Sequence, residues 1–155
     1  VPNMYRYMAN SPALFLAYTQ GYQAFREQSG FSPTEQEVVL LTISTQNGCE
    51  YCKSAHSFIA DQMSKIPREI TNAVLNQQPI SDEKLEALRQ FTMNMVEQRG
   101  WVDQDAVDAL KKAGYKDQHV YDVVAAIGVK TLSNFFNHLT GTPVDEVFAG
   151  AAEAN

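Results

Sequence analysis

The sequence predicts an all-α protein that folds as a single-domain helical bundle. Apolar residues recur at helical spacing in successive segments, which begin at proline or capping residues and mostly end at glycine. Alternating strand patterns are absent apart from one short apolar run. Because 155 residues can bury a core without disulfide or metal support, we expect one domain over residues 1–155.

Two helices are predicted in the first third of the chain. One covers residues 11–30, between a Ser-Pro start and a glycine stop, with apolar side chains at a 3.6-residue period. The next begins at a capping box over residues 32–35 and contains the run 38–43, which resembles a buried strand. The capping box and the length of this segment favour a fully buried helix instead.

The cysteine-containing helix and the remaining helices follow in order. Asn47-Gly48 ends the second helix, and Asn47 is expected to cap the third, with Glu50 three residues later. Both cysteines would then lie in the first turns of that third helix. Four more helices and a short final piece are predicted at residues 67–75, 81–99, 103–113, 117–139 and 143–148.

Charge and hydropathy exclude several classes of partner. The formal net charge is −6, and no cluster of lysine and arginine interrupts it, so neither a nucleic acid nor an acidic membrane surface is expected as a partner. No apolar run is long enough to span a bilayer, and no signal peptide is evident. A cytoplasmic location is the expectation; the start at Val1 suggests a fragment that lacks a leader.

The only two cysteines, Cys49 and Cys52, carry the strongest chemical signal. Two cysteines are too few for a secreted disulfide scaffold, and a close pair indicates metal or redox chemistry. On a helix Cys49, Cys52 and His56 would fall at positions i, i+3 and i+7, on one face. The helix start favours Cys49 as the thiolate, whereas His56 favours Cys52, so spacing leaves the attacking cysteine open.

Two other interpretations of the pair compete with redox chemistry. Cys-x₂-Cys is a zinc half-site, with Glu37 as a possible oxygen ligand, but a second Cys or His pair is absent. His119 and His138 are nineteen residues apart on the long predicted helix and are assigned no role. The other interpretation is two inert buried thiols. We expect no bound metal.

The pattern of Glu37, eleven residues, Cys49, two residues, Cys52, three residues and His56 resembles a known motif. It is similar to that of the alkylhydroperoxidase D-like branch of the carboxymuconolactone decarboxylase family, and the likeness extends over residues 11–141. The resemblance implies a helical homo-oligomer, a trimer or hexamer, that reduces hydroperoxides or partner disulfides. It also implies that Cys52 is the nucleophile, Cys49 the resolving thiol, and Glu37 with His56 a proton relay.

Three features bear on the activity that the resemblance implies: the cofactor, residue 51 and the alternative reactions. Without a nucleotide-binding glycine motif, we expect no cofactor and an external dithiol reductant, lipoyl or thioredoxin-like. The best-studied branch carries a histidine just before the second cysteine, where this chain has Tyr51. Alternative functions are lactone decarboxylation and a non-catalytic redox sensor. Asn134, on the long predicted helix, could face the cysteine site. Five aromatic residues could line an apolar pocket: Tyr18, Tyr22, Phe25, Phe135 and Phe136.

Overall fold

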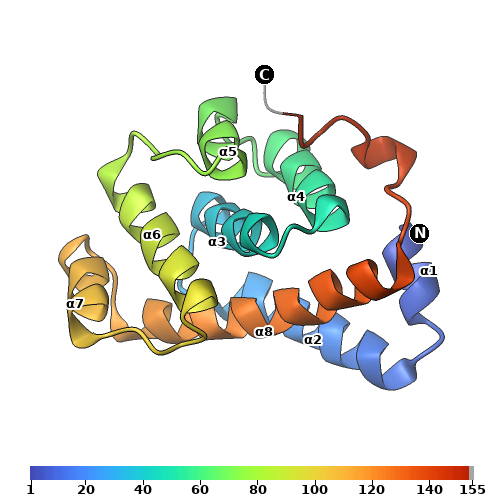
Figure 1. Ribbon diagram of the computed structural model, residues 1–155, viewed down its shortest axis with the longest axis horizontal. Coiled ribbons are helices and arrows are strands. Elements are labelled where there is room, and N and C mark those ends of the chain that lie inside the picture. Colours follow the sequence, from blue (N-terminus) through green and yellow to red (C-terminus); the bar gives the residue numbers. More distant parts are fainter. Residues whose placement is uncertain (154–155) are drawn as a thin grey trace.

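The computed structural model describes residues 1–153 and is all-helical over that range (Figure 1). Its helices are α1 (Asn3–Met8), α2 (Pro12–Gln28), α3 (Pro33–Gln46), α4 (Glu50–Gln62), α5 (Arg68–Leu75), α6 (Glu83–Glu97), α7 (Gln104–Lys112), α8 (Asp117–Thr140) and the 3₁₀ turn η1 (Glu146–Phe148). The predicted fold class is therefore confirmed. Residues 154 and 155, which the predicted domain includes, lie outside the described residues.

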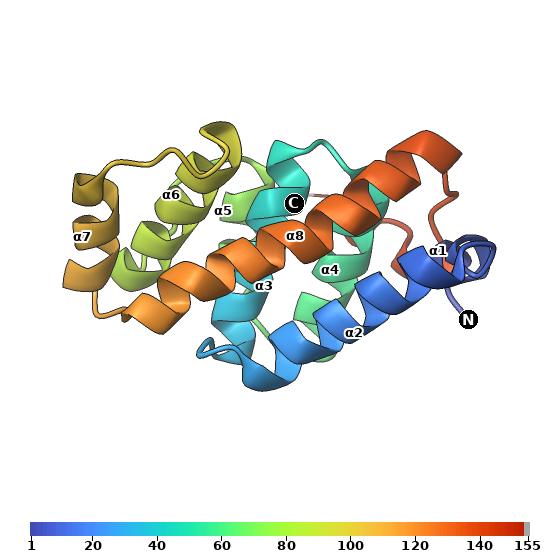
Figure 2. The ribbon, with the colours of Figure 1, turned by 90° about the horizontal axis from the view of Figure 1, so that it is seen from below.

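Helix α3 is the central element of the bundle. It packs against α4, α5, α6 and α8, which surround it in Figures 1 and 2. Every residue from position 36 to position 44 is buried, so α3 has no solvent-facing stripe. This confirms the prediction of a fully buried helix over residues 38–43. Ser32 accepts a hydrogen bond from Glu35 N, and Glu35 accepts one from Ser32 N, which completes the predicted capping box.

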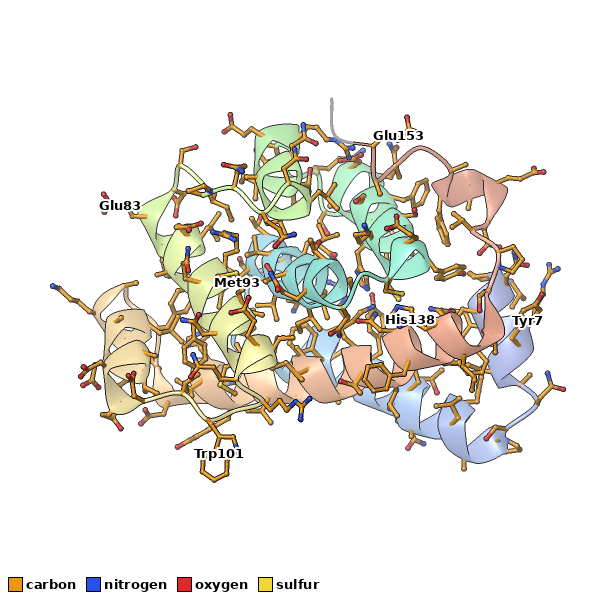
Figure 3. The ribbon with its side chains drawn as sticks, viewed as in Figure 1. Tyr7, Glu83, Met93, Trp101, His138 and Glu153 are labelled. Atoms are coloured by element: carbon orange, nitrogen blue, oxygen red, sulfur yellow. The ribbon has the colours of Figure 1, made fainter. Side chains whose placement is uncertain are left out.

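Helices α2 and α8 run side by side along one face of the bundle (Figure 2). Gly21 permits their close approach, since a Cβ at this position would lie 3.1 Å from Val129 Cγ2. Gly141 ends α8 in the left-handed conformation, with a φ of 56°. Figure 3 shows Trp101, in the connection between α6 and α7, pointing away from the body of the protein, and it is 88% exposed. Among residues 1–153, no helix combines the length and apolar character that a membrane span requires.

The connection between α3 and α4 differs from the prediction. Asn47 is the C-cap of α3 and not the N-cap of α4. Gly48 follows with a φ of 65°, and Cys49 is the N-cap of α4, with extended backbone angles. The local pattern Asn47 to Glu50 had suggested a cap, but the left-handed glycine places the helix start two residues later. The sequence also gave no sign of α1, whose six residues are held by tertiary contacts.

Candidate active site

The two cysteines lie at the start of α4, inside the protein. Cys49 is 1% exposed, Cys52 is 2% exposed, and both are reduced. Cys52 lies in the first turn of α4, whereas Cys49 is outside the helix, so the predicted i, i+3, i+7 stripe applies only to Cys52 and His56. The Cys49 thiol hydrogen-bonds to the Cys52 sulfur. The pair is therefore close enough for direct thiol chemistry.

Glu37 and His56 are in direct contact, as the resemblance implied. His56 Nδ1 lies 3.0 Å from Glu37 Oε2, and both side chains are buried. Arg26 of α2 forms an ion pair with the other carboxylate oxygen of Glu37. Burial acts to raise the pKa of Glu37, but the hydrogen bond from His56 and the charge of Arg26 outweigh it and hold that pKa below its ordinary value. Glu37 is thus an anion at neutral pH.

Lys130 of α8 completes this row of polar groups. Its Nζ lies 2.9 Å from His56 Nε2, and the residue is 1% exposed. Because the Glu37 carboxylate can only accept, His56 carries its hydrogen on Nδ1, and the Nε2 lone pair accepts from the lysine. Burial, followed by the charge of Lys130, lowers the pKa of His56, so its ring is neutral at neutral pH.

Polar groups of α8 also surround the Cys52 sulfur. Asn137 Nδ2 donates to Cys52 Sγ at 3.3 Å, and Ser133 Oγ lies 3.8 Å from the same atom. The hydrogen bond from Cys49 has the largest effect on the pKa of Cys52 and, with the charge of Lys130, holds it well below its ordinary value despite burial. The same hydrogen bond, with burial, raises the pKa of Cys49. The geometry therefore favours Cys52 as the thiolate, a choice that spacing had left open.

Sequence reasoning missed Lys130, Ser133 and Asn137, although α8 carried a signal for them. These residues continue from Ala126 at intervals of three and four, which is the spacing of one helix face, and that face is buried. Three polar residues in succession on an apolar face are unusual unless they have partners inside the protein. Arg26 was also missed; nothing in the local sequence marks it.

A cavity of about 250 Å³ opens onto the thiolate. Cys52, His56 and Lys130 line it together, and its walls are mostly apolar and aromatic: Pro2, Met4, Tyr5, Tyr18, Tyr22, Tyr51, Ala55, Ile59, Met63 and Phe148. Of the aromatic set considered for a pocket, only Tyr18 and Tyr22 line this one. Phe25 belongs to the core around α3, and Phe135 is 61% exposed on α8. The cavity suits a small apolar molecule.

Tyr51 faces away from the row of Glu37, His56 and Lys130. Its hydroxyl donates to Asp145 Oδ2 at 2.6 Å and accepts from Met4 N at 3.3 Å. Asp145 also accepts from Asn3 N at 3.0 Å, so one carboxylate joins α1, α4 and the C-terminal segment. Burial raises the pKa of Tyr51, and the hydrogen bond to Asp145 raises it further. Tyr51 holds the chain ends over the cavity and does not replace a relay histidine.

Replacing Asp145 by alanine is expected to expose the cysteines. The substitution removes the acceptor shared by Tyr51 and Asn3, and a lost hydrogen bond to a charged group costs about 1.5–3 kcal/mol, which favours opening of α1 by a factor of ten or more. The rate of iodoacetamide alkylation at Cys52 should rise accordingly. Asp108→Ala, on the exposed face of α7, is the matched control. An unchanged alkylation rate would show that reagents reach Cys52 by another route.

Asn134 and His119, which the sequence analysis considered as polar residues near the site or as metal ligands, lie outside this site. Asn134 is buried and accepts a hydrogen bond from Asn47 Nδ2 at 2.9 Å, and His119 Nε2 lies 3.1 Å from Gly30 O at the far end of α8. Both ring nitrogens of His56 already have partners, which leaves it no lone pair for zinc. Across the described part of the chain, no group of three or more His, Cys, Asp or Glu side chains is arranged to hold a metal ion.

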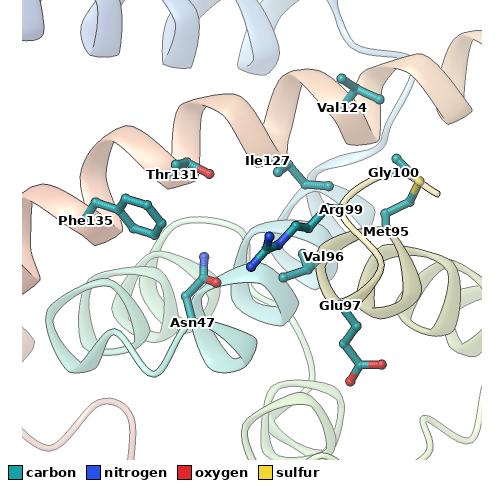
Figure 4. A pocket seen from close by; sticks show the side chains of 10 residues that line it. All are labelled: Asn47, Met95, Val96, Glu97, Arg99, Gly100, Val124, Ile127, Thr131 and Phe135. Atoms are coloured by element: carbon teal, nitrogen blue, oxygen red, sulfur yellow. The ribbon is translucent and has the colours of Figure 1, made fainter. Parts of the chain in front are cut away.

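A larger groove, of about 760 Å³, lies between α8 and the C-terminal end of α6. Figure 4 shows its lining: Asn47, Met95, Val96, Glu97, Arg99, Gly100, Val124, Ile127, Thr131 and Phe135. It contains none of the predicted site residues, so we assign the chemistry to the smaller cavity. The exposed apolar side chains of α8 fit the expected homo-oligomer, which stays a prediction.

Three kinds of comparison relate this chain and its fold to known proteins. A model described as the carboxymuconolactone decarboxylase family matches residues 12–93. A comparison with curated proteins gives no match. Among solved structures, the alkylhydroperoxidase AhpD core of an uncharacterized peroxidase-related protein from Ralstonia eutropha is 23% identical, with a TM-score of 0.86 over 100% of this chain and 83% of that one.

Two further solved structures show the range of proteins with this fold. A debrominase in complex with 2,3,4-tribromopyrrole is 18% identical, with a TM-score of 0.83 over 97% of this chain and 81% of that one. A putative antioxidant defence protein AhpD from Agrobacterium tumefaciens is 20% identical, with a TM-score of 0.69 over 90% of this chain and 97% of that one. At these identities the likeness shows a shared fold.

Proposed function

The chain belongs to the carboxymuconolactone decarboxylase family, and within that family we propose that it is a dithiol oxidoreductase that reduces small hydroperoxides through a Cys49–Cys52 disulfide. One observation carries the proposal: the Cys49 thiol donates a hydrogen bond to the Cys52 sulfur, which itself faces a cavity. This arrangement supplies a nucleophile, a resolving thiol and room for a substrate at one place.

The proposed reaction balances with these two thiols. The Cys52 thiolate attacks the terminal peroxide oxygen, the O–O bond breaks, and Cys52 becomes a sulfenic acid while the departing alkoxide takes up a proton. The Cys49 thiol then attacks the sulfenic sulfur, which gives the disulfide and water. The dithiol has lost two electrons and the peroxide has gained them. An external dithiol, with a lipoyl group or a thioredoxin-like protein as the candidates, restores both thiols.

Burial of the cysteines favours a small-molecule substrate over a protein disulfide. At 1% and 2% exposure, neither sulfur can meet a disulfide on a folded partner unless α1 and the C-terminal segment move. A small hydroperoxide with an apolar tail needs only the cavity of about 250 Å³. The same argument favours a lipoyl group as reductant, because a dithiol on a flexible arm can enter where a protein surface cannot.

Stoichiometric oxidation tests the proposal directly. Reduced protein mixed with one equivalent of cumene hydroperoxide is expected to lose both free thiols and two hydrogen atoms of intact mass, and to release an equal amount of the alcohol. Added dihydrolipoamide should restore the thiols and allow continued turnover. Thiols that stay reduced while the peroxide persists would refute the proposal. Disulfide formation without turnover under any dithiol would indicate a redox sensor instead.

Reductive dehalogenation is a second candidate, favoured by the aromatic walls of the cavity. The debrominase with the same fold was crystallised with a small brominated ring, and here Tyr5, Tyr18 and Tyr22 line the space in front of Cys52. A dithiol supplies the two electrons needed to replace bromine by hydrogen, with bromide and a proton released. Bromide release from 2,3,4-tribromopyrrole, in the presence of dihydrolipoamide, would distinguish this activity from peroxide reduction.

A further inference from the structure

Lys130 is buried without a carboxylate partner. Its ammonium lies inside the bundle at 1% exposure, and across residues 1–153 no ion pair joins it to an aspartate or a glutamate. Its one hydrogen bond goes to the neutral imidazole of His56. Because burying an unpaired charge is costly, the lysine needs an anion nearby, and the Cys52 thiolate, whose pKa its charge lowers, is that anion.

Lys130 also lines the cavity onto which the Cys52 sulfur opens. Cys52, His56 and Lys130 line it together with the phenols of Tyr5, Tyr18 and Tyr22, whereas Tyr51, in the place of the relay histidine, is bound to Asp145. His56 Nε2 offers a lone pair and no hydrogen, since its hydrogen is on Nδ1 toward Glu37. Burial raises the pKa of the Tyr22 phenol to about 12, which makes it a weak proton donor. Lys130 is the cationic proton donor among the residues that line the substrate space with Cys52.

We propose that Lys130 is a catalytic residue, the general acid that protonates the alkoxide leaving group when Cys52 attacks a hydroperoxide. This inference rests on the proposed function. In the step, the S–O bond forms, the O–O bond breaks, and a proton passes from Lys130 Nζ to the departing oxygen, which leaves as an alcohol. Lys130 becomes a neutral amine. When an external dithiol later reduces the Cys49–Cys52 disulfide to one thiol and one thiolate, the proton released restores the ammonium.

His56 and Glu37 act through Lys130 in this scheme. The Glu37 carboxylate holds the imidazole in the tautomer whose Nε2 lone pair orients the ammonium, so these two are positioning residues for the acid. The titratable and charged groups that face Lys130 or its two neighbours come from several elements: Tyr5 of α1, Tyr18, Tyr22 and Arg26 of α2, Glu37 of α3, Cys49 before α4, and Tyr51, Cys52 and His56 of α4.

A comparison of leaving groups separates acid catalysis from other roles of the lysine. Cumene hydroperoxide releases an alkoxide that needs a proton, whereas peracetic acid releases acetate and iodoacetamide releases iodide, which do not. The single-turnover rate of Cys52 with each reagent would be measured in wild type, Lys130→Met and Lys130→Arg, at a pH where the Cys52 thiolate is fully formed in each protein. Lys112→Met, at an exposed lysine of α7, is the matched control.

We expect Lys130→Met to react more slowly with the hydroperoxide than wild type does, and to react with the other two reagents at nearly the wild-type rate. Lys130→Met should lower the cumene hydroperoxide rate about a hundredfold, the usual size of general acid catalysis, and change the other two rates by a few fold at most. An equal fall with all three reagents, or no fall, would overturn the inference. A wild type that reacts with iodoacetamide and peracetic acid but not with the hydroperoxide would overturn the proposed function itself.

A measurement on the wild type covers the case in which Lys130→Met does not fold. The ratio of the hydroperoxide rate to the iodoacetamide rate removes the titration of Cys52, which affects both. That ratio should be lower in D₂O than in H₂O, because a proton moves to the leaving oxygen in the hydroperoxide step, and the corresponding ratio for peracetic acid should be the same in both solvents. A hydroperoxide ratio that is the same in both solvents would overturn the role of Lys130.

Discussion

Replacing Cys52 by serine is expected to lower hydroperoxide reduction by at least about a thousandfold, because the variant has no nucleophile. Cys49 remains in this variant, but its burial still favours the protonated thiol over the thiolate. Peroxide consumption would be followed with dihydrolipoamide as reductant. Activity equal to that of wild type would exclude Cys52 as the attacking group.

Two substitutions of Cys49 separate its roles as resolving thiol and as hydrogen-bond donor. Cys49→Ser keeps a donor beside Cys52, so the thiolate should persist and the protein should complete one attack and stop at the sulfenic acid. Cys49→Ala removes the donor as well, so the pKa of Cys52 should rise and iodoacetamide alkylation should shift to higher pH. Identical alkylation profiles in the two variants would contradict the hydrogen bond as the main cause of the low pKa.

Replacing Glu37 by alanine is expected to destabilise the fold more than any other single change at the site. Glu37 is fully buried between Arg26 and His56, and removing one member of a buried ion pair costs about 3–5 kcal/mol, since the other charge loses its partner. Chemical denaturation would measure the free energy of unfolding. Glu37→Gln, which keeps the shape and one hydrogen-bond acceptor, should lose less.

A matched control variant and the pH dependence of stability test whether Glu37 stabilises the fold through Arg26 and His56. Glu27→Ala removes an exposed carboxylate of α2, whose contact is with Gln23, and should change the unfolding free energy little.

The folded-state pKa values of His56 and Glu37 lie below their ordinary values of 6.5 and 4.5. The unfolded chain therefore binds more protons, and wild-type stability should decline as pH falls below about 6.5 and again below about 4.5. Glu37→Gln should show a smaller second decline, and the part that remains is expected from Glu86, whose pKa is also lowered by its hydrogen bonds to Arg89, Ile80 and Gln90. A pH dependence identical to that of wild type would contradict the assignment.

The helices were predictable because their signals are local. The capping box at Ser32, the glycine stop at Gly141 and the apolar periodicity between them depend on neighbours within a few residues, and the structure confirms each. The errors also arose locally. Asn47 and Glu50 imitate a capping pattern, and only the left-handed Gly48 moves the helix start to Cys49. Helix α1 was missed because six residues carry too little periodicity to predict a helix.

For the candidate site, the sequence by itself determined the residue types and their spacing, and so predicted Glu37, the cysteine pair and His56 as the site residues. Only the tertiary structure decided which sulfur is the thiolate, where Tyr51 points and that Lys130 joins the site. The physical reason is distance along the chain. His56 and Lys130 are 74 residues apart, and Tyr51 and Asp145 are 94 apart. Such partners meet only when α8 and the C-terminal segment pack against α4, and the pattern of neighbouring residues does not predict that contact.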